Sequence, residues 1–295
     1  MFLKRSTLFN GVIAIGIAIT LVLFALPSKA LQVQISPRNP QLGDTISVVV
    51  QAQTPPTVTL GSKSYPTFDL GNNRYRALLP TTPLDRPGRL TLGVNAGSDS
   101  SGVAQSANRQ TLTLTLRNRS FPTQSIWLPP SKTTANSDYE FDRVDAFKAI
   151  VSPQKFWSGK FQRPNNGGVT SGYGIRRYYN GVFAKDYYHR GIDYAGNSGS
   201  AIVAPAPGRV VLVGREADGF KIHGNCVGID HGQGVATIYL HLSRITVKEG
   251  DFVRTGQRIG ALGGTGAATG PHLHWGVYVN GLAVDPTPWR SINFE

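Results

Sequence analysis

The chain has 295 residues, which is enough for two domains of ordinary size, each able to bury a hydrophobic core. Its 30 basic residues outnumber its 17 acidic residues and give a formal net charge of +13. This excess is spread along the chain instead of forming a run, which argues against a nucleic-acid-binding module. A diffuse positive charge suits binding to an anionic polymer such as a cell wall or to a membrane surface, and the alternative is that it only keeps the protein soluble.

Residues 1–30 resemble a secretory signal peptide. Lys4 and Arg5 precede an apolar run over residues 12–26, and the small residues Ser28 and Ala30 occupy the positions that a signal peptidase recognises. We therefore expect cleavage after Ala30 and an exported protein, located in the periplasm or elsewhere in the cell envelope or outside the cell. An uncleaved membrane anchor is the alternative, although the run is shorter than the roughly 20 residues that a spanning helix prefers.

Residues 31–118 predict an accessory β-sandwich of immunoglobulin-like type. Short alternating or β-branched runs are separated by Pro, Gly and Asn, and no helical period is present: LQVQIS, DTISVVVQA, TVTLG, RLTLGVNA and QTLTLTLR. The segment contains no histidine and no cysteine, and its few acidic residues lie beside turn residues. We expect a binding or spacing module here, without catalytic residues.

Residues 119–154 predict a linker with one short helix. The Pro-containing stretch LPPSKTTANS is typical of an exposed connector. It is followed by FDRVDAFKAI, residues 141–150, in which Val144, Phe147 and Ile150 would line one face of a helix that ends before Pro153.

Residues 155–295 predict a second, compact antiparallel β domain, so the fold class is all-β. The dipeptides Asn180-Gly181 and Asn280-Gly281 are strong signals for type I′ hairpins between apolar strands. The single cysteine, Cys226, excludes an internal disulfide framework, and its strand-like neighbours indicate a buried thiol and not a nucleophile.

All six histidines lie in this second domain, which is the first sign of a functional site. His189 and Asp193 are four residues apart, and His241 ends an apolar strand. In the sequence HLH, His272 and His274 share one face of a predicted strand, because strand side chains alternate between faces. Hydrolytic zinc sites take three ligands from His, Asp and Glu and keep a fourth position for water, so His189, Asp193 and one histidine of the pair would form such a site. Two further histidines would suit proton transfer and oxyanion stabilisation.

Five segments, in this order, resemble the M23 (LytM/lysostaphin-type) zinc metallopeptidases that cut peptidoglycan cross-bridges: TSGYGIRR, HRGIDYA, IDHGQGVATIYLHLS, VKEGDFVRTGQRIGALGGTG and TGPHLHWGVYVNG. The resemblance covers about residues 155–290. It implies a compact antiparallel β fold with a metal groove, one Zn²⁺ per chain and peptidoglycan as the substrate. It further implies that His189, Asp193 and His274 bind the zinc, while His241 and His272 form the catalytic pair.

Three other functions fit parts of the pattern. A non-catalytic member of this family could activate a cell wall amidase, but such proteins usually lack several of the five residues that are present here. A biotinyl or lipoyl carrier would need a lysine at the hairpin tip of EGDFVRTGQ, where there is none. A pure cell-wall-binding protein would not need the five-residue set, although the first domain could still bind the wall. Outside the set, Asp230-His231-Gly232 is typical of a turn, and His223 has no assigned role.

Overall fold

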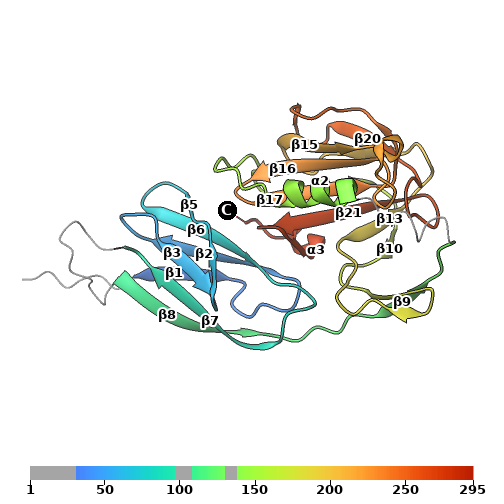
Figure 1. The fold of residues 1–295 in the computed structure, drawn as a ribbon. Helices are drawn as coiled ribbons and strands as arrows, with labels where there is room; N and C mark the ends of the chain where they lie inside the picture. Colours follow the sequence, from blue (N-terminus) through green and yellow to red (C-terminus); the bar gives the residue numbers. More distant parts are fainter. Residues whose placement is uncertain (1–30, 98–107, 130–137, 295) are drawn as a thin grey trace, which may run out of the picture.

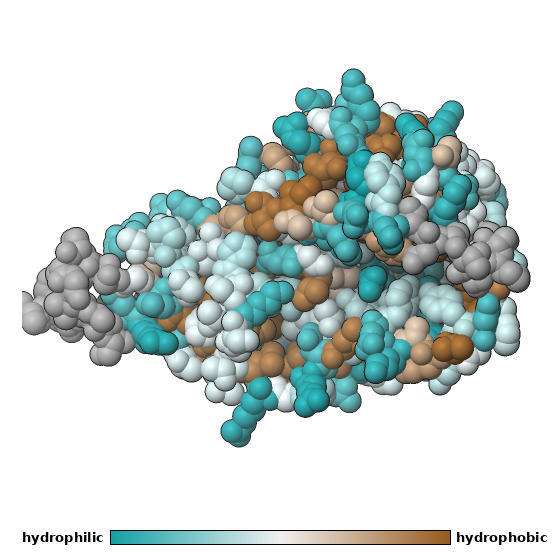
Figure 2. Space-filling model, in the orientation of Figure 1, coloured by the Kyte–Doolittle hydropathy of each residue, from teal (hydrophilic) through white to brown (hydrophobic). Residues whose placement is uncertain are grey.

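The computed structural model describes residues 31–97, 108–129 and 138–294, so the predicted signal peptide lies outside the described residues. Strands predominate, and the antiparallel sheets confirm the predicted all-β class. Two bodies are visible, with the N-terminal strands in one and the C-terminal strands in the other (Figure 1). None of the helices within the described ranges is long and apolar enough to cross a membrane. On the face shown in Figure 2, hydrophilic side chains are scattered over both bodies and do not gather in one patch.

The N-terminal body contains two four-stranded sheets that pack face to face. One sheet has the order β1 (Gln32–Ser36), β2 (Thr45–Gln51), β6 (Arg74–Pro80) and β5 (Phe68–Asp69). The other has the order β4 (Lys63–Tyr65), β3 (Thr57–Leu60), β7 (Gly88–Asn95) and β8 (Arg109–Leu116). Alternate side chains of both sheets, such as Val48 and Leu92, form one shared core. This arrangement is a β-sandwich.

Strand β6 was not among the predicted strands, because both of its faces are buried and it lacks the alternation of a half-exposed strand. Ala77 and Leu79 point into the sandwich core. Arg76 and Leu78 point the other way, toward the C-terminal body, whose core includes Leu78. The strand therefore serves as the contact surface between the two bodies.

Arg76 is the central polar contact between the two bodies and is fully buried. Its guanidinium donates hydrogen bonds to the backbone carbonyl of Phe294 and to the side-chain carbonyl of Gln233. It also lies over the ring of Trp157, at 5.1 Å from the ring centroid. A buried charge of this kind is costly to expose or to leave without partners, so these contacts join the two bodies firmly.

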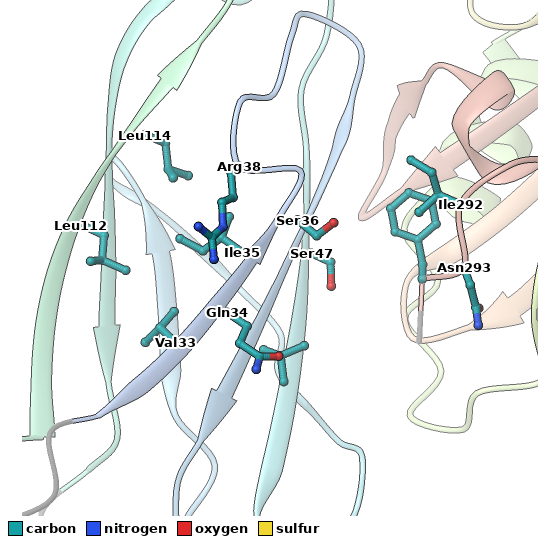
Figure 3. A pocket seen from close by; sticks show the side chains of 12 residues that line it. Val33, Gln34, Ile35, Ser36, Arg38, Ser47, Leu112, Leu114, Ile292 and Asn293 are labelled. Atoms are coloured by element: carbon teal, nitrogen blue, oxygen red, sulfur yellow. The ribbon is translucent and has the colours of Figure 1, made fainter.

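A hollow of about 580 Å³ lies beside this contact surface. It opens between the edge strands of the sandwich, where Ile35 of β1 and Leu114 of β8 line it (Figure 3). Ile292, from the end of the chain, lines its other side. The hollow contains none of the predicted site residues.

The C-terminal body is built on a large antiparallel sheet. Its order is β10 (Val169–Ser171), β13 (Ile192–Ala195), β21 (His272–Val279), β17 (Val235–Leu240), β16 (Cys226–Gly232), β15 (Gly208–Gly214) and β19 (Phe252–Val253), and β22 (Leu282–Val284) also pairs with β21. A second sheet contains β14 (Ala201–Val203), β20 (Arg258–Leu262) and β18 (Leu242–Ile245). The C-terminal body also contains two short helices, a 3₁₀ helix (Glu216–Asp218) and α3 (Pro286–Trp289).

Both predicted hairpins are present. Asn180 and Gly181 have φ angles of 48° and 84°, and Asn280 and Gly281 have 46° and 84°, as a type I′ turn requires. The first turn joins β11 (Arg176–Tyr179) to β12 (Val182–Phe183), and the second joins β21 to β22. Cys226 is buried as predicted, and burial raises the pKa of its thiol to about 12.

The segment between the two bodies packs on the C-terminal body. Strand β9 (Thr123–Ile126) pairs with β11 in parallel, and helix α2 (Asp138–Lys148) buries Val144 and Phe147. Phe147 packs edge-to-face on Tyr278 of β21, with 6.1 Å between ring centroids. The helix begins three residues before the predicted start, where Asp138 and Glu140 favour a helix N-terminus, and Ile150 lies beyond its end. The connecting segment is therefore packed onto the C-terminal body through a strand and a helix.

Candidate metal centre

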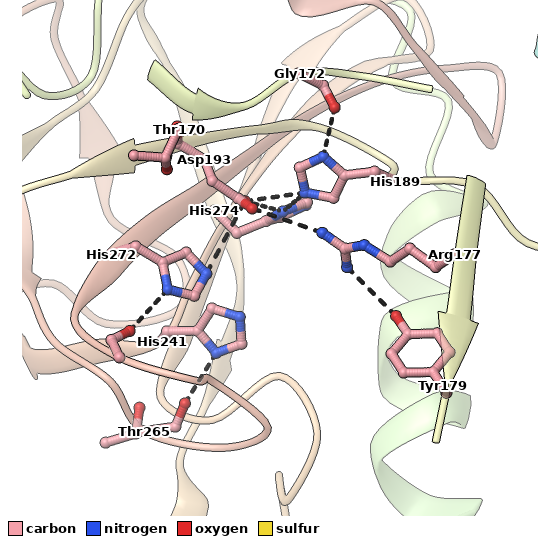
Figure 4. A network of polar contacts seen from close by, with 11 residues as sticks. Thr170, Gly172, Arg177, Tyr179, His189, Asp193, His241, Thr265, His272 and His274 are labelled. Carbon is pink, nitrogen blue, oxygen red and sulfur yellow. Dashed lines mark hydrogen bonds and ion pairs between the residues drawn. The ribbon is translucent and has the colours of Figure 1, made fainter. Parts of the chain in front are cut away.

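Asp193 and His274 face each other on neighbouring strands. Strand β13 pairs with β21 in an antiparallel register that places these two residues directly opposite. His189, four residues before Asp193, completes a buried triangle (Figure 4). Asp193 Oδ1 lies 2.9 Å from His189 Nε2 and 2.9 Å from His274 Nδ1, and the two nitrogens are 3.0 Å apart. The structure thus brings the three predicted ligands together.

The triangle fits one zinc ion. A tetrahedral zinc with ligands at about 2.0–2.1 Å separates those ligands by about 3.3 Å, within a few tenths of the separations seen here. Within the part of the chain that the structure describes, these three side chains form a group of possible metal ligands with all donor atoms inside 4.8 Å. Two imidazoles and one carboxylate are a donor set that zinc prefers, and they leave one tetrahedral vertex open.

The protonation states also suit a metal. His189 Nδ1 lies 2.7 Å from the carbonyl oxygen of Gly172, so Nδ1–H donates there and the lone pair of Nε2 points at the triangle. Burial by itself raises the pKa of Asp193, but its polar contacts with His189 and His274 outweigh burial and hold the pKa well below its usual range. Burial lowers the pKa of His274 to about 4. A carboxylate and neutral imidazoles are the forms that bind metal.

His241 and His272 lie beside the triangle, with 4.7 Å between their ring centroids. Each directs Nδ1 at a backbone carbonyl 2.8 Å away, that of Thr265 for His241 and that of Gly270 for His272. In neutral rings this arrangement leaves Nε2 as a proton acceptor. Burial and the neighbouring His272 lower the pKa of His241 to about 3, so its ring is neutral at pH 7.

These two histidines share the site because of strand geometry. His272 lies on the same face of β21 as His274, and the intervening Leu273 is buried in the core on the other face. His241 comes directly after β17, whose last residue, Leu240, is opposite His274. Its φ angle of 64° is uncommon for residues other than glycine and marks the point where the chain leaves the large sheet.

Sequence reasoning missed Arg177, whose Nη2 lies 3.7 Å from the second carboxylate oxygen of Asp193. The guanidinium also donates to the hydroxyl of Tyr179 at 3.3 Å. Strand alternation from the Asn180-Gly181 turn would have placed Arg177 and Tyr179 on one face of β11. It could not have shown that this face meets Asp193.

His231 lies inside strand β16, so the prediction of a turn at this position was wrong. The ring is fully buried, with its nitrogens 2.7 Å from Pro207 O and 2.8 Å from Thr237 Oγ1, and burial lowers its pKa to about 4. The register shifts between Asp230 and Gly232, and Gly232 has a φ of 88°. This β-bulge uses the same residue types as a turn, which explains the error.

The five predicted residues lie along a groove of about 950 Å³. One wall comes from β9 and β11 and includes Ile126, Arg177 and Tyr179. Other parts of the lining come from the loop before β21 and from Phe141 of α2 together with His223. The segment that connects the two bodies therefore contributes to the groove that contains the predicted metal ligands.

Gly191 is predicted to be essential for the position of His274. A Cβ at Gly191 would lie 2.4 Å from Trp275 O and 2.8 Å from His274 Nε2, so the imidazole or the strand would have to move. We expect Gly191→Ala to weaken zinc binding about 10- to 100-fold, measured by competition with a chelating dye. Gly168→Ala is the control, because a Cβ there meets no atom within 4 Å. Unchanged zinc affinity in Gly191→Ala would contradict the prediction.

Comparisons with known proteins converge on one family. Residues 187–286 match the model described as "Peptidase family M23". Over 98 residues, 33% of this chain, the sequence is 43% identical to an uncharacterized metalloprotease of Haemophilus influenzae and 45% identical to the peptidoglycan DD-endopeptidase ShyC of Vibrio cholerae. The matched segments are 20% and 22% of those proteins, so this chain spans about a fifth of the length of these curated relatives.

One solved structure resembles almost the whole chain. It is a putative peptidase M23 from Pseudomonas aeruginosa, with a TM-score of 0.60 and 26% sequence identity. The match covers 86% of this chain and 95% of that one. The arrangement of both bodies, and not of the C-terminal body alone, therefore recurs in that protein.

Proposed function

Since residues 187–286 form a domain of peptidase family M23, we propose that this chain is a zinc-dependent endopeptidase that hydrolyses peptide cross-links of bacterial peptidoglycan. The observation that carries the proposal is the buried triangle of His189, Asp193 and His274 with a pair of histidines beside it. A structural zinc site would be closed by a fourth protein ligand, whereas this donor set leaves a position open at a groove.

Zinc held by the triangle would polarise the scissile carbonyl and make a water molecule a stronger nucleophile at neutral pH. The neutral His241, with Nε2 free to accept, takes the proton from the attacking water and returns it to the leaving amine. His272, when protonated at Nε2, donates a hydrogen bond to the oxyanion that develops on the carbonyl. Arg177 lies 3.7 Å from the second carboxylate oxygen of Asp193 and would help to keep the carboxylate in place.

Peptidoglycan is proposed as the substrate because a relative that shares this segment is named a peptidoglycan DD-endopeptidase. The basic character of the chain suits an anionic wall. Residues 1–30 support export of the protein to that compartment.

The test is digestion of purified, cross-linked peptidoglycan by residues 31–295, with released muropeptides resolved by mass. We expect loss of cross-linked dimers, inhibition by a zinc chelator and recovery when zinc is returned. The masses of the products identify the bond that is cut. Cleavage that is insensitive to the chelator would contradict the zinc mechanism. A purified protein that holds no zinc and cuts nothing would favour the amidase-activator alternative.

A further inference from the structure

Helix α2 carries a buried carboxylate that accepts hydrogen bonds from a loop of the C-terminal body. Glu140, in its first turn, is fully buried. It accepts hydrogen bonds from the backbone N–H of Ile222 at 3.1 Å, from the backbone N–H of His223 at 2.6 Å and from His223 Nδ1 at 2.6 Å. Burial by itself raises the pKa of Glu140, but these hydrogen bonds outweigh burial and lower it, so the group is ionised. Glu140 lies outside the segment that matches the peptidase family.

The loop that Glu140 holds is bonded in turn to His241. The carbonyl of His223 accepts the backbone N–H of His241 at 3.1 Å. Two residues further, the N–H of Asn225 donates to Thr265 Oγ1 at 3.0 Å, and the carbonyl of Thr265 accepts Nδ1–H of His241. The loop over residues 222–225 thus contacts both the backbone of His241 and the residue that holds its ring.

His241 needs such support more than an ordinary strand residue. Its φ of 64° lies in the left-handed region, which costs free energy for a side chain with a Cβ and persists only where the surroundings enforce it. The backbone hydrogen bond to His223 is one of the contacts that enforce it.

We propose that Glu140 is a positioning residue, which anchors the loop over residues 222–225 to the connecting helix and so fixes the position of His241 in the groove. This inference rests on the proposed function. Val144 and Phe147 bury the apolar face of α2, and Glu140 adds polar contacts between the helix and the loop over residues 222–225.

The test compares Glu140→Gln with Asp142→Asn, which removes an exposed carboxyl group from the same helix. Glutamine keeps one acceptor oxygen but turns an NH₂ group toward N–H donors. We expect kcat of Glu140→Gln to fall about 10- to 100-fold, as displacement of a catalytic group by about 1 Å does, with KM and bound zinc unchanged. Amide hydrogen exchange should accelerate over residues 222–225 and at His241, and Asp142→Asn should behave as wild type.

Several outcomes would overturn the proposal. Unchanged kcat and unchanged exchange at His241 would show that Glu140 does not fix it. A rise in KM alone would indicate that His223 binds substrate, and loss of zinc or general acceleration of exchange would indicate a purely structural role. If wild type itself cuts no substrate, the proposed function fails, while the local exchange measurement still decides whether Glu140 anchors His241.

Discussion

Replacing Asp193 with alanine should remove both bound zinc and peptidase activity. Asp193 is the carboxylate of the ligand triangle, and its Oδ1 contacts both His189 Nε2 and His274 Nδ1. Without it, two imidazoles remain, the ion loses its anionic ligand, and the orientation of both rings relaxes. In the proposed mechanism, nucleophile activation and carbonyl polarisation depend on the same ion, so we expect activity to fall by more than about 10³-fold.

Zinc in the purified variant is measured by elemental analysis, and activity by release of muropeptides. Asp186→Ala is the matched control, since it removes an exposed carboxyl group seven residues earlier in the chain. Stoichiometric zinc in Asp193→Ala would show that the ion binds elsewhere and would overturn the assignment of the triangle.

His241→Ala should separate zinc binding from turnover. His241 packs beside His272, next to the triangle, and its Nδ1 bonds to the carbonyl of Thr265. The variant should therefore hold zinc as wild type does. Loss of a general base costs about 10²- to 10⁴-fold in rate, and we expect kcat to fall by this factor.

The control for this variant is Arg244→Ala, an exposed position three residues further along the chain. Normal turnover in His241→Ala would exclude the residue as the base. Loss of zinc in His241→Ala would indicate that His241 is itself a zinc ligand.

Much of the site follows from local sequence pattern. Alternation along a strand is enough to place His272 and His274 on one face, and the structure confirms this for β21. The Asn-Gly dipeptides fix two hairpins for a similar reason, because their backbone conformation is local. The roles of the five residues as ligands or catalytic groups stay predictions until zinc and turnover are measured.

The long-range contacts could not be predicted in the same way. Glu140 and His223 are 83 residues apart, and no periodicity in either segment indicates that they meet. Arg177 lies on β11 and Asp193 on β13, which belong to two different sheets, so their contact depends on how those sheets pack. Strand β6 escaped prediction because its second face is covered by the other body. In each case the contact depends on a segment far away in the sequence, and neither segment alone indicates that the two meet.

The buried Arg76 also helps to fix the orientation of the groove relative to the sandwich. Separating the bodies would withdraw Arg76 from Phe294, Gln233 and Trp157 at once, and the lost contacts would have to be replaced by water. The sandwich and the groove are therefore held in one fixed relative orientation. A partner that binds the sandwich would also set the angle at which the groove meets that partner.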